Sequence, residues 1–270
     1  MPREAIVDLP CRVKHELGGG SLRAGSRGLV NLLRAREVAA LVRARPRQDG
    51  RAVESISVKM MHLAESGVEE VAHTVGELEA QATRLDPLVP YCTNCPANAL
   101  RRSFGCVGGL PYPIRRAVEV YALGRVTGNV GGALLQQTLI DRGFDGAGTR
   151  EHRVEGKFQA LPGPSRKLDD GRMLTADQLF EPLMIANGKL PPWMSLNILL
   201  WFDAITLDGK SPSTVDDVLM LTRLDAAERP KRTKCRLGPQ ATDPDAEPFR
   251  GFLKVLYVAW SRDLEVMIDS

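Results

Sequence analysis

Aromatic residues are scarce in this sequence, with Phe, Trp and Tyr together making up 5% of the chain. β-Sandwiches and barrels depend on aromatic and β-branched side chains, so this scarcity argues against an all-β fold. Leucine, alanine and valine supply most of the apolar surface instead. The composition therefore favours helices.

The sequence also lacks any long apolar run. No stretch approaches the roughly 18–20 apolar residues that span a bilayer, and the best candidate, 252–258, is interrupted by Lys254. The first residues, Met1 to Glu4, place an acidic residue where a signal peptide has a basic flank and an apolar run. These features predict a cytoplasmic protein with no membrane partner.

Neither sign of charge dominates. The chain carries 36 Lys and Arg against 33 Asp and Glu, a net charge of +3. This balance excludes a general polyanion-binding field, so any nucleic-acid interaction requires a local basic patch. The hydrophobic share of 43% excludes a disordered chain.

The apolar periodicity predicts the first elements clearly. Apolar residues recur at helical spacing over 22–45, and Pro46 and Gly50 end this helix. Residues 55–60 alternate between polar and apolar, which is typical of a half-buried strand, and 68–73 return as the second strand of a hairpin. Thr74 and Glu77 then form a capping box that begins another helix.

The rest of the chain is predicted to be mainly helical. Residues 91–113 are rich in Gly and Pro and indicate an irregular loop, followed by helices at 114–123 and 130–142. A Gly- and Pro-containing connection at 156–171 separates an α+β region, 1–155, from a helical region, 172–270, unless both form one continuous domain. Further helices are expected after the capping box at Thr175 and over 194–205, 214–228 and 249–268. The predicted fold class is α+β and predominantly helical, with a small β-hairpin and a cysteine-containing loop in the N-terminal half.

Three cysteines within that loop form the most specific chemical pattern. Cys92 and Cys95 are separated by two residues, and Cys106 follows after ten intervening residues. Two thiolates at this spacing can converge on one ion, and Pro96 and Gly105 suit a backbone that bends around it. The pattern predicts a cysteine-ligated metal or iron–sulfur site, structural rather than catalytic, in an intracellular protein.

A tetrahedral site requires a fourth ligand. We favour Cys11, which follows a proline in a loop-like stretch, and the other candidates are Cys235, His73 and His15. These residue types do not decide between zinc and an iron–sulfur cluster. A redox-active pair without metal and inert buried thiols are the alternatives for the cysteines themselves.

Arginines flank the same loop. Arg101 and Arg102 lie between the cysteines, and Arg115 and Arg116 lie just after them. Guanidinium groups bind phosphate and carboxylate, so a second hypothesis is a nucleic-acid or anion-binding module whose loop is braced by the metal. A third is an enzyme with an open metal position. A nucleic acid and a protein are both conceivable partners, and no substrate is indicated.

A glycine run offers a weaker signal. Gly128, Gly131 and Gly132 precede a predicted helix, where free amides could bind a phosphate. The spacing matches neither the dinucleotide fingerprint nor a P-loop, so an ordinary helix start is the preferred interpretation.

Overall fold

A computed structural model describes residues 3–45, 52–64, 67–110, 112–168, 171–185, 188–238 and 244–269. The chain forms two compact units, which we call the N-terminal unit (residues 10–105) and the main unit (residues 1–9 and 106–270). No helix among the described residues is long and apolar enough to cross a membrane. Each unit is described by itself.

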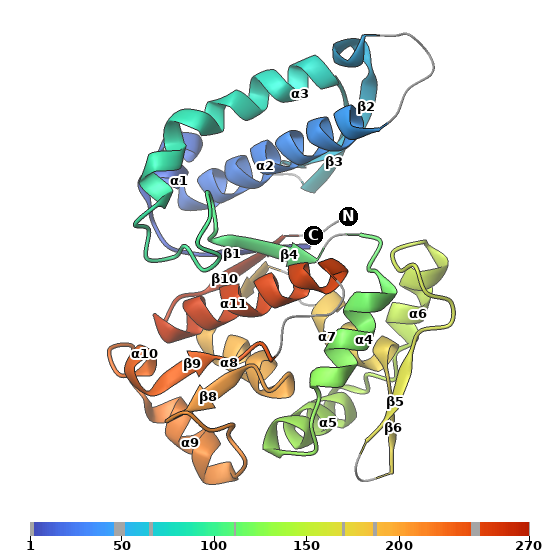
Figure 1. Cartoon of the computed structure of the whole chain (residues 1–270), viewed down its shortest axis with the longest axis vertical. Coiled ribbons are helices and arrows are strands. Elements are labelled where there is room, and N and C mark those ends of the chain that lie inside the picture. The colour runs from blue at the N-terminus through green and yellow to red at the C-terminus, as the bar shows by residue number, and fades with distance from the viewer. Residues whose placement is uncertain are drawn as a thin grey trace. The chain divides into compact units, whose positions relative to one another are not determined.

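The N-terminal unit begins with two helices at very close approach. Helix α1 (Arg12–Gly18) and helix α2 (Leu22–Ala44) are joined by a tight turn, and the Ser21 hydroxyl accepts a hydrogen bond from the Ala24 amide to cap α2 (Figure 1). A Cβ atom added at Gly25 would lie 1.8 Å from the Lys14 carbonyl oxygen. Only glycine therefore permits this helix contact.

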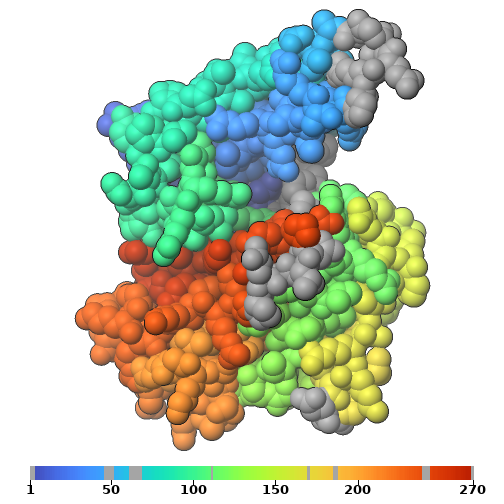
Figure 2. All heavy atoms as spheres, in the orientation of Figure 1, coloured from blue at the N-terminus to red at the C-terminus, as the bar shows by residue number. Residues whose placement is uncertain are grey.

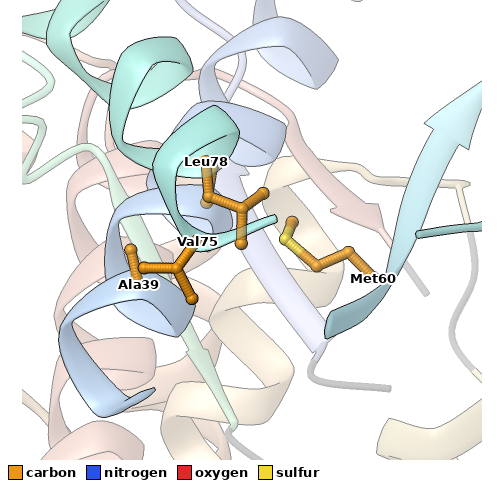
Figure 3. Close-up of a cluster of buried hydrophobic side chains, with 5 residues drawn as sticks. Ala39, Met60, Val75 and Leu78 are labelled. Atoms are coloured by element: carbon orange, nitrogen blue, oxygen red, sulfur yellow. The ribbon is translucent and has the colours of Figure 1, made fainter. Parts of the chain in front are cut away.

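A hairpin and a further helix complete the core of this unit. Strand β2 (Ser57–Ala64) pairs antiparallel with β3 (Gly67–Thr74), preceded by a short 3₁₀ helix η1 (Val53–Ser55). Helix α3 (Val75–Ala82) starts at the predicted capping box and continues into a 3₁₀ segment, η2 (Thr83–Cys92). Figure 3 shows side chains from α2, β2 and α3 meeting in one buried cluster: Ala35, Ala39, Met60, Val75 and Leu78. The amphipathic faces predicted for 22–45 and 55–60 are thus buried against each other.

The main unit is organised around an antiparallel sheet that the sequence analysis did not predict. Its order is β4 (Val107–Leu110), β1 (Arg3–Val7), β10 (Val266–Asp269) and β7 (Gly188–Leu190). The two central strands come from opposite ends of the sequence, with Ile6 opposite Met267 and Val7 opposite Val266. Residues 5–7 are completely buried, which explains why this short strand reads as a continuous apolar run.

Helix α11 (Glu247–Ser261) is the centre of the main unit. It packs against β1 and β4 and, on its other side, against α8 (Pro192–Trp201) (Figure 1). Phe249, fully buried, packs its ring against those of Phe180, Phe202 and Phe252, with centroids 4.9–6.1 Å apart. Four of the seven phenylalanines of the sequence are therefore concentrated in one core.

The remaining elements of the main unit are short. They are α4 (Arg116–Arg125), α5 (Val130–Arg142), α6 (Ala147–Val154), β5 (Ser165–Lys167), β6 (Met173–Thr175), α7 (Ala176–Ile185), β8 (Ile205–Leu207), α9 (Val215–Arg223), α10 (Arg229–Arg232), β9 (Thr233–Cys235) and η3 (Pro244–Ala246). Strand β5 pairs with β6 and β8 with β9.

These elements confirm a predominantly helical α+β fold. The differences lie at the ends of predicted helices. The helix expected over 249–268 ends at Ser261 and the chain continues as β10, while the one expected over 194–205 ends at Trp201 before β8. Part of the predicted irregular loop 91–113 is strand β4. Sheet pairing between distant segments overrides the local apolar periodicity at these positions.

The two compact units divide the chain at positions 9/10 and 105/106. The predicted connection at 156–171 lies wholly within the main unit, where 165–167 form strand β5. A division of the helical part of the chain at 156–171 stays a prediction.

Candidate functional site

The four cysteines proposed as metal ligands do not form a metal site. Cys92 ends η2 and Cys95 follows in the next turn, Cys11 precedes α1, and Cys106 belongs to the main unit, just before β4. Within the part of the chain that the structure describes, no three His, Cys, Asp or Glu side chains are grouped so that they could hold a metal ion. The predicted metal- or cluster-binding function is therefore wrong, and the metal-braced module and the open-metal enzyme lose their basis with it.

The other candidate ligands lie in three different elements. His15 lies in α1 and His73 in β3, whereas Cys235 lies in β9 of the main unit. Burial raises the pKa of Cys235 to about 12 despite the nearby cations Lys254, Arg125 and Arg250. This half-buried thiol is therefore protonated at neutral pH.

An asparagine, rather than a metal, organises the loop after Cys92. The Asn98 side-chain amide donates to the Cys92 carbonyl oxygen at 2.8 Å, and its Oδ1 accepts from the Arg102 amide at 3.2 Å. The backbone closes the loop further, because the Leu100 amide donates to the Gly105 carbonyl and the Gly105 amide donates to the Arg102 carbonyl. These bonds replace the cross-link that the sequence analysis assigned to an ion.

Close packing explains why the residue at position 105 is a glycine. A Cβ atom at this position would lie 2.0 Å from Asn98 Oδ1 and 3.0 Å from the Arg102 carbonyl oxygen. The backbone of Gly105 is outside the left-handed region, so the glycine is required for space and not for conformation. The close approach that we assigned to a bound metal is made to the Asn98 side chain.

Two residues of the loop adopt backbone angles that are unusual for their type. Arg101 has φ +53° and Phe104 has φ +57°, each at a typical cost of about 1–2 kcal/mol. Phe104 is 2% exposed, so its buried ring anchors the end of the loop. Arg101 has no such anchor and is exposed, and its backbone angle is fixed by the hydrogen bonds of the loop around it.

This loop forms one wall of a pocket of about 540 Å³. Its lining is Val89, Thr93, Asn94, Cys95, Asn98, Arg101, Arg102 and Ser103. The segment appears teal to green in Figure 2, where it reaches the surface of the N-terminal unit. All eight residues belong to that unit, so the pocket is complete within it.

The pocket presents hydrogen-bond donors and positive charge. Six of its eight lining residues carry a side-chain N–H or O–H group, two of these are arginines, and none of the eight is acidic. Arg101 and Arg102 form no ion pair with any residue that the structure describes. Arg36, on α2 of the same unit, is in contrast paired with Asp86 at 2.6 Å. An arginine pair without a carboxylate favours an external anion.

The other two predicted arginines lie elsewhere. Arg115 precedes α4 in the main unit and is paired with Asp245, and Arg116 is the first residue of that helix. The structure therefore brings together Arg101, Arg102 and Cys95, and places Arg115 and Arg116 in the other unit.

The glycine run before α5 is explained by packing. The Asn129 side chain caps this helix by accepting from the amides of Gly131 and Gly132 at 3.0 and 3.3 Å. A Cβ atom at Gly131 would lie 2.0 Å from the Leu200 carbonyl oxygen at the end of α8. The amides that a phosphate would need are occupied, and the glycine permits close contact between two helices.

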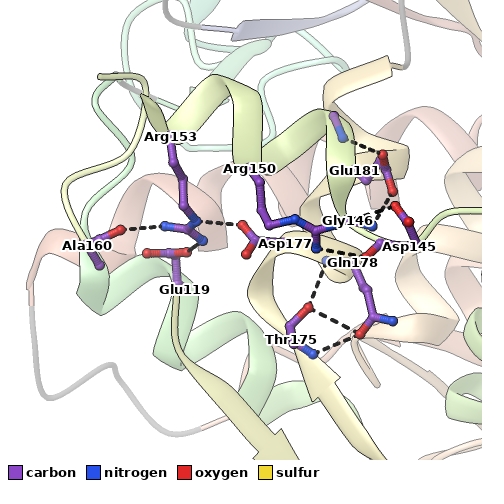
Figure 4. Close-up of polar contacts among 11 residues, drawn as sticks. Glu119, Asp145, Gly146, Arg150, Arg153, Ala160, Thr175, Asp177, Gln178 and Glu181 are labelled. Carbon is purple, nitrogen blue, oxygen red and sulfur yellow. Dashed lines mark hydrogen bonds and ion pairs between the residues drawn. The ribbon is translucent and has the colours of Figure 1, made fainter. Parts of the chain in front are cut away.

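A buried ionic network in the main unit is structural. Figure 4 shows Arg153 of α6 between Glu119 of α4 and Asp177 of α7, and it also donates to the Ala160 carbonyl at 2.9 Å. Glu181 accepts from the amides of Gly146 and Gly148 at the start of α6. Burial raises the pKa of Glu119, which is completely inaccessible to solvent. These groups link helices α4, α6 and α7.

No known protein family, curated protein or solved structure shows a significant match to this chain. The pocket is therefore the feature that indicates a function. Cys95 and the arginine pair were predictable from the sequence, whereas Asn94, Asn98 and Ser103 were not predicted. A polar side chain three residues after Cys95, followed by a glycine at 105, was the available signal for a loop closed by its own side chain.

Proposed function

We propose that this protein binds a small anionic ligand, through a phosphate or carboxylate group, in the pocket beside Arg101 and Arg102. The single observation that supports this function is a concave pocket wall, rich in hydrogen-bond donors, that includes two arginines without carboxylate partners. Arginine binds both anions through two parallel N–H groups, and neutral amide and hydroxyl donors complete such sites.

The size of the pocket supports a small molecule. Ligand sites typically have volumes of about 300–1,000 Å³, and this pocket has about 540 Å³. A phosphate alone would leave most of this volume empty, so the ligand includes a further polar part of the size of a nucleoside or a short peptide. Asn94, Thr93 and Ser103 are the donors and acceptors available to it.

An extended nucleic acid is less well supported. Non-specific binding to a single strand requires a positively charged groove that follows the backbone, with aromatic rings for the bases. Tyr91 is the nearest exposed aromatic residue in the sequence, and the guanidinium of Arg12 lies over one face of its ring, 4.0 Å from the centroid. This face of the ring therefore makes an intramolecular cation–π contact and is not free to stack on a base.

Calorimetric titration of the full chain with inorganic phosphate, a nucleoside monophosphate and succinate tests the proposal. We expect saturable binding of at least one of them, weakened about tenfold by Arg101→Gln or Arg102→Gln through the loss of a charge-assisted contact. Arg84→Gln is the matched control. It removes the same charge from the same unit, at an exposed position outside the pocket lining, and should leave the affinity unchanged.

Two outcomes would overturn this function. The first is the absence of saturable binding of all three anions at millimolar concentration. The second is tight, strongly salt-dependent binding of a single-stranded oligonucleotide that Arg84→Gln weakens as much as Arg101→Gln does, because that would indicate a diffuse electrostatic surface.

A further inference from the structure

Two thiols lie on one turn at the edge of the pocket. Cys92 is the last residue of the 3₁₀ segment η2, and the amide of Cys95 donates to the Cys92 carbonyl oxygen at 3.3 Å. Side chains three residues apart eclipse each other in a 3₁₀ turn. The Cys95 thiol lies close enough to Cys92 to raise its pKa, in a turn whose i to i+3 Cα spacing is compatible with a disulfide.

The two thiols differ in access. Cys95 is half-buried and lines the pocket, so a molecule in the pocket can reach its sulfur. Cys92 is only 5% exposed, and the Phe104 amide donates to its sulfur. Burial raises the pKa of Cys92, which keeps it a thiol until a partner is brought close. These properties suit Cys95 to attack an incoming disulfide and Cys92 to resolve the mixed disulfide that forms.

We propose that Cys92 and Cys95 form a thiol–disulfide exchange site for low-molecular-weight disulfides that carry carboxylates. This inference rests on the proposed function for its substrate class, because Arg101 and Arg102 attract the carboxylates of such a molecule to the pocket. The exchange chemistry depends instead on the Cys92–Cys95 turn and on the partial exposure of Cys95. A redox-active pair without metal is one of the alternatives that the cysteine spacing leaves open.

The reaction has two balanced steps. Cys95 loses its proton to solvent and attacks one sulfur of the disulfide RSSR, forming a mixed disulfide Cys95–SR and releasing RS⁻, which takes up a proton. Cys92 then loses its proton and attacks the Cys95 sulfur, forming the Cys92–Cys95 disulfide and releasing a second RS⁻, which is protonated in turn. The two protein thiols lose two electrons and one RSSR is reduced to two RSH.

Exposure of the full chain to glutathione disulfide, followed by alkylation and non-reducing mass spectrometry, tests this site. We expect wild-type protein to lose two hydrogen atoms, with the bond mapping to Cys92 and Cys95. Cys92→Ser should stop at a protein carrying one glutathione on Cys95. Cys95→Ser should acquire neither modification at the turn, while Cys235→Ser, which removes a half-buried thiol of the main unit, should react like the wild type at the turn.

A neutral reagent separates this inference from the proposed function. Arg101→Gln should slow the reaction with glutathione disulfide about tenfold more than it slows the reaction with hydroxyethyl disulfide at low ionic strength. Equal rates for wild type and Arg101→Gln with both reagents, together with a Cys92–Cys95 bond, would refute the anion pocket and the substrate class while leaving the exchange chemistry. If phosphate binds but Cys92 and Cys95 remain reduced, or if a disulfide forms with Cys11 instead, the exchange site is refuted and the anion pocket stands.

Discussion

Replacing Gly105 with alanine tests the hydrogen-bonded loop that forms the wall of the pocket. The new Cβ would lie 2.0 Å from Asn98 Oδ1, so the Asn98 amide must leave its position. It would then lose both of its hydrogen bonds, to the Cys92 carbonyl and from the Arg102 amide. A hydrogen bond contributes about 0.5–1.5 kcal/mol to stability, so the expected loss in the free energy of unfolding is about 2 kcal/mol.

The Asn98→Ala variant makes this reasoning quantitative. It deletes the same two hydrogen bonds, so it should cost about the same 2 kcal/mol by itself. Once the amide is absent, the Cβ at position 105 meets chiefly the Arg102 carbonyl oxygen at 3.0 Å, which requires a small shift. The double variant should therefore be about as stable as Asn98→Ala alone, a coupling of about 1.5–2 kcal/mol.

Urea unfolding of the full chain, followed by circular dichroism, measures these differences as shifts of the midpoint at constant slope. Gly124→Ala is the matched control, because Gly124 lies in α4 with nothing within 4 Å of its added Cβ and should gain about 0.5–1 kcal/mol of helix stability. Strictly additive costs of Gly105→Ala and Asn98→Ala would refute the proposed steric link between the two residues. Phosphate titration of the same variants should show weakened binding, because Asn98 lines the pocket.

Four further results are expected. Gly25→Ala should destabilise the protein by about 2 kcal/mol because its Cβ would meet the α1 backbone, whereas Gly28→Ala, with its nearest neighbours at 3.4 Å, should stabilise it by up to about 1 kcal/mol in the same urea assay. Arg153→Gln should cost about 3–5 kcal/mol, since it leaves the completely buried Glu119 without its cation, and a loss below 1 kcal/mol would contradict the structural role. Cys235→Ala should flatten the decline of stability above pH 9: the folded thiol keeps its proton up to a pKa of about 12 while the unfolded one loses it near 9, so this group lowers the free energy of unfolding by about 1.4 kcal/mol per pH unit in that window. EDTA should leave the urea midpoint of the wild type unchanged, and a fall in that midpoint would indicate a stabilising metal.

Local signals in the sequence were sufficient for the N-terminal unit. The apolar stripe over 22–45, the alternation around Met60 and the Thr74 capping box each depend on residues within a few positions of one another. The structure has α2, the β2–β3 hairpin and α3 at these places. Helix α5 and its stop at Gly143 were predictable for the same reason, since a glycine with φ +65° ends a helix by local geometry alone.

Cysteine spacing, in contrast, did not determine whether the thiols converge. The spacing from Cys95 to Cys106 is compatible with a metal loop, but convergence depends on the path of the ten residues between them. That path is set by Asn98, whose side chain fills the space beside Gly105, and by Phe104, whose ring is buried. Side-chain hydrogen bonds of this kind leave no periodic pattern in a sequence.

The sequence by itself determined the helical character of the chain, its capped helix starts and the hairpin, because those follow from propensities and patterns within single segments. Only the tertiary structure decided that β1 and β10, from the two ends of the chain, pair at the centre of one sheet, since strand pairing depends on partners more than 250 positions away. It also decided that Arg101 and Arg102 share one pocket wall while Arg115 pairs with Asp245. The physical reason is the same in each case: burial and charge pairing are properties of neighbours in space.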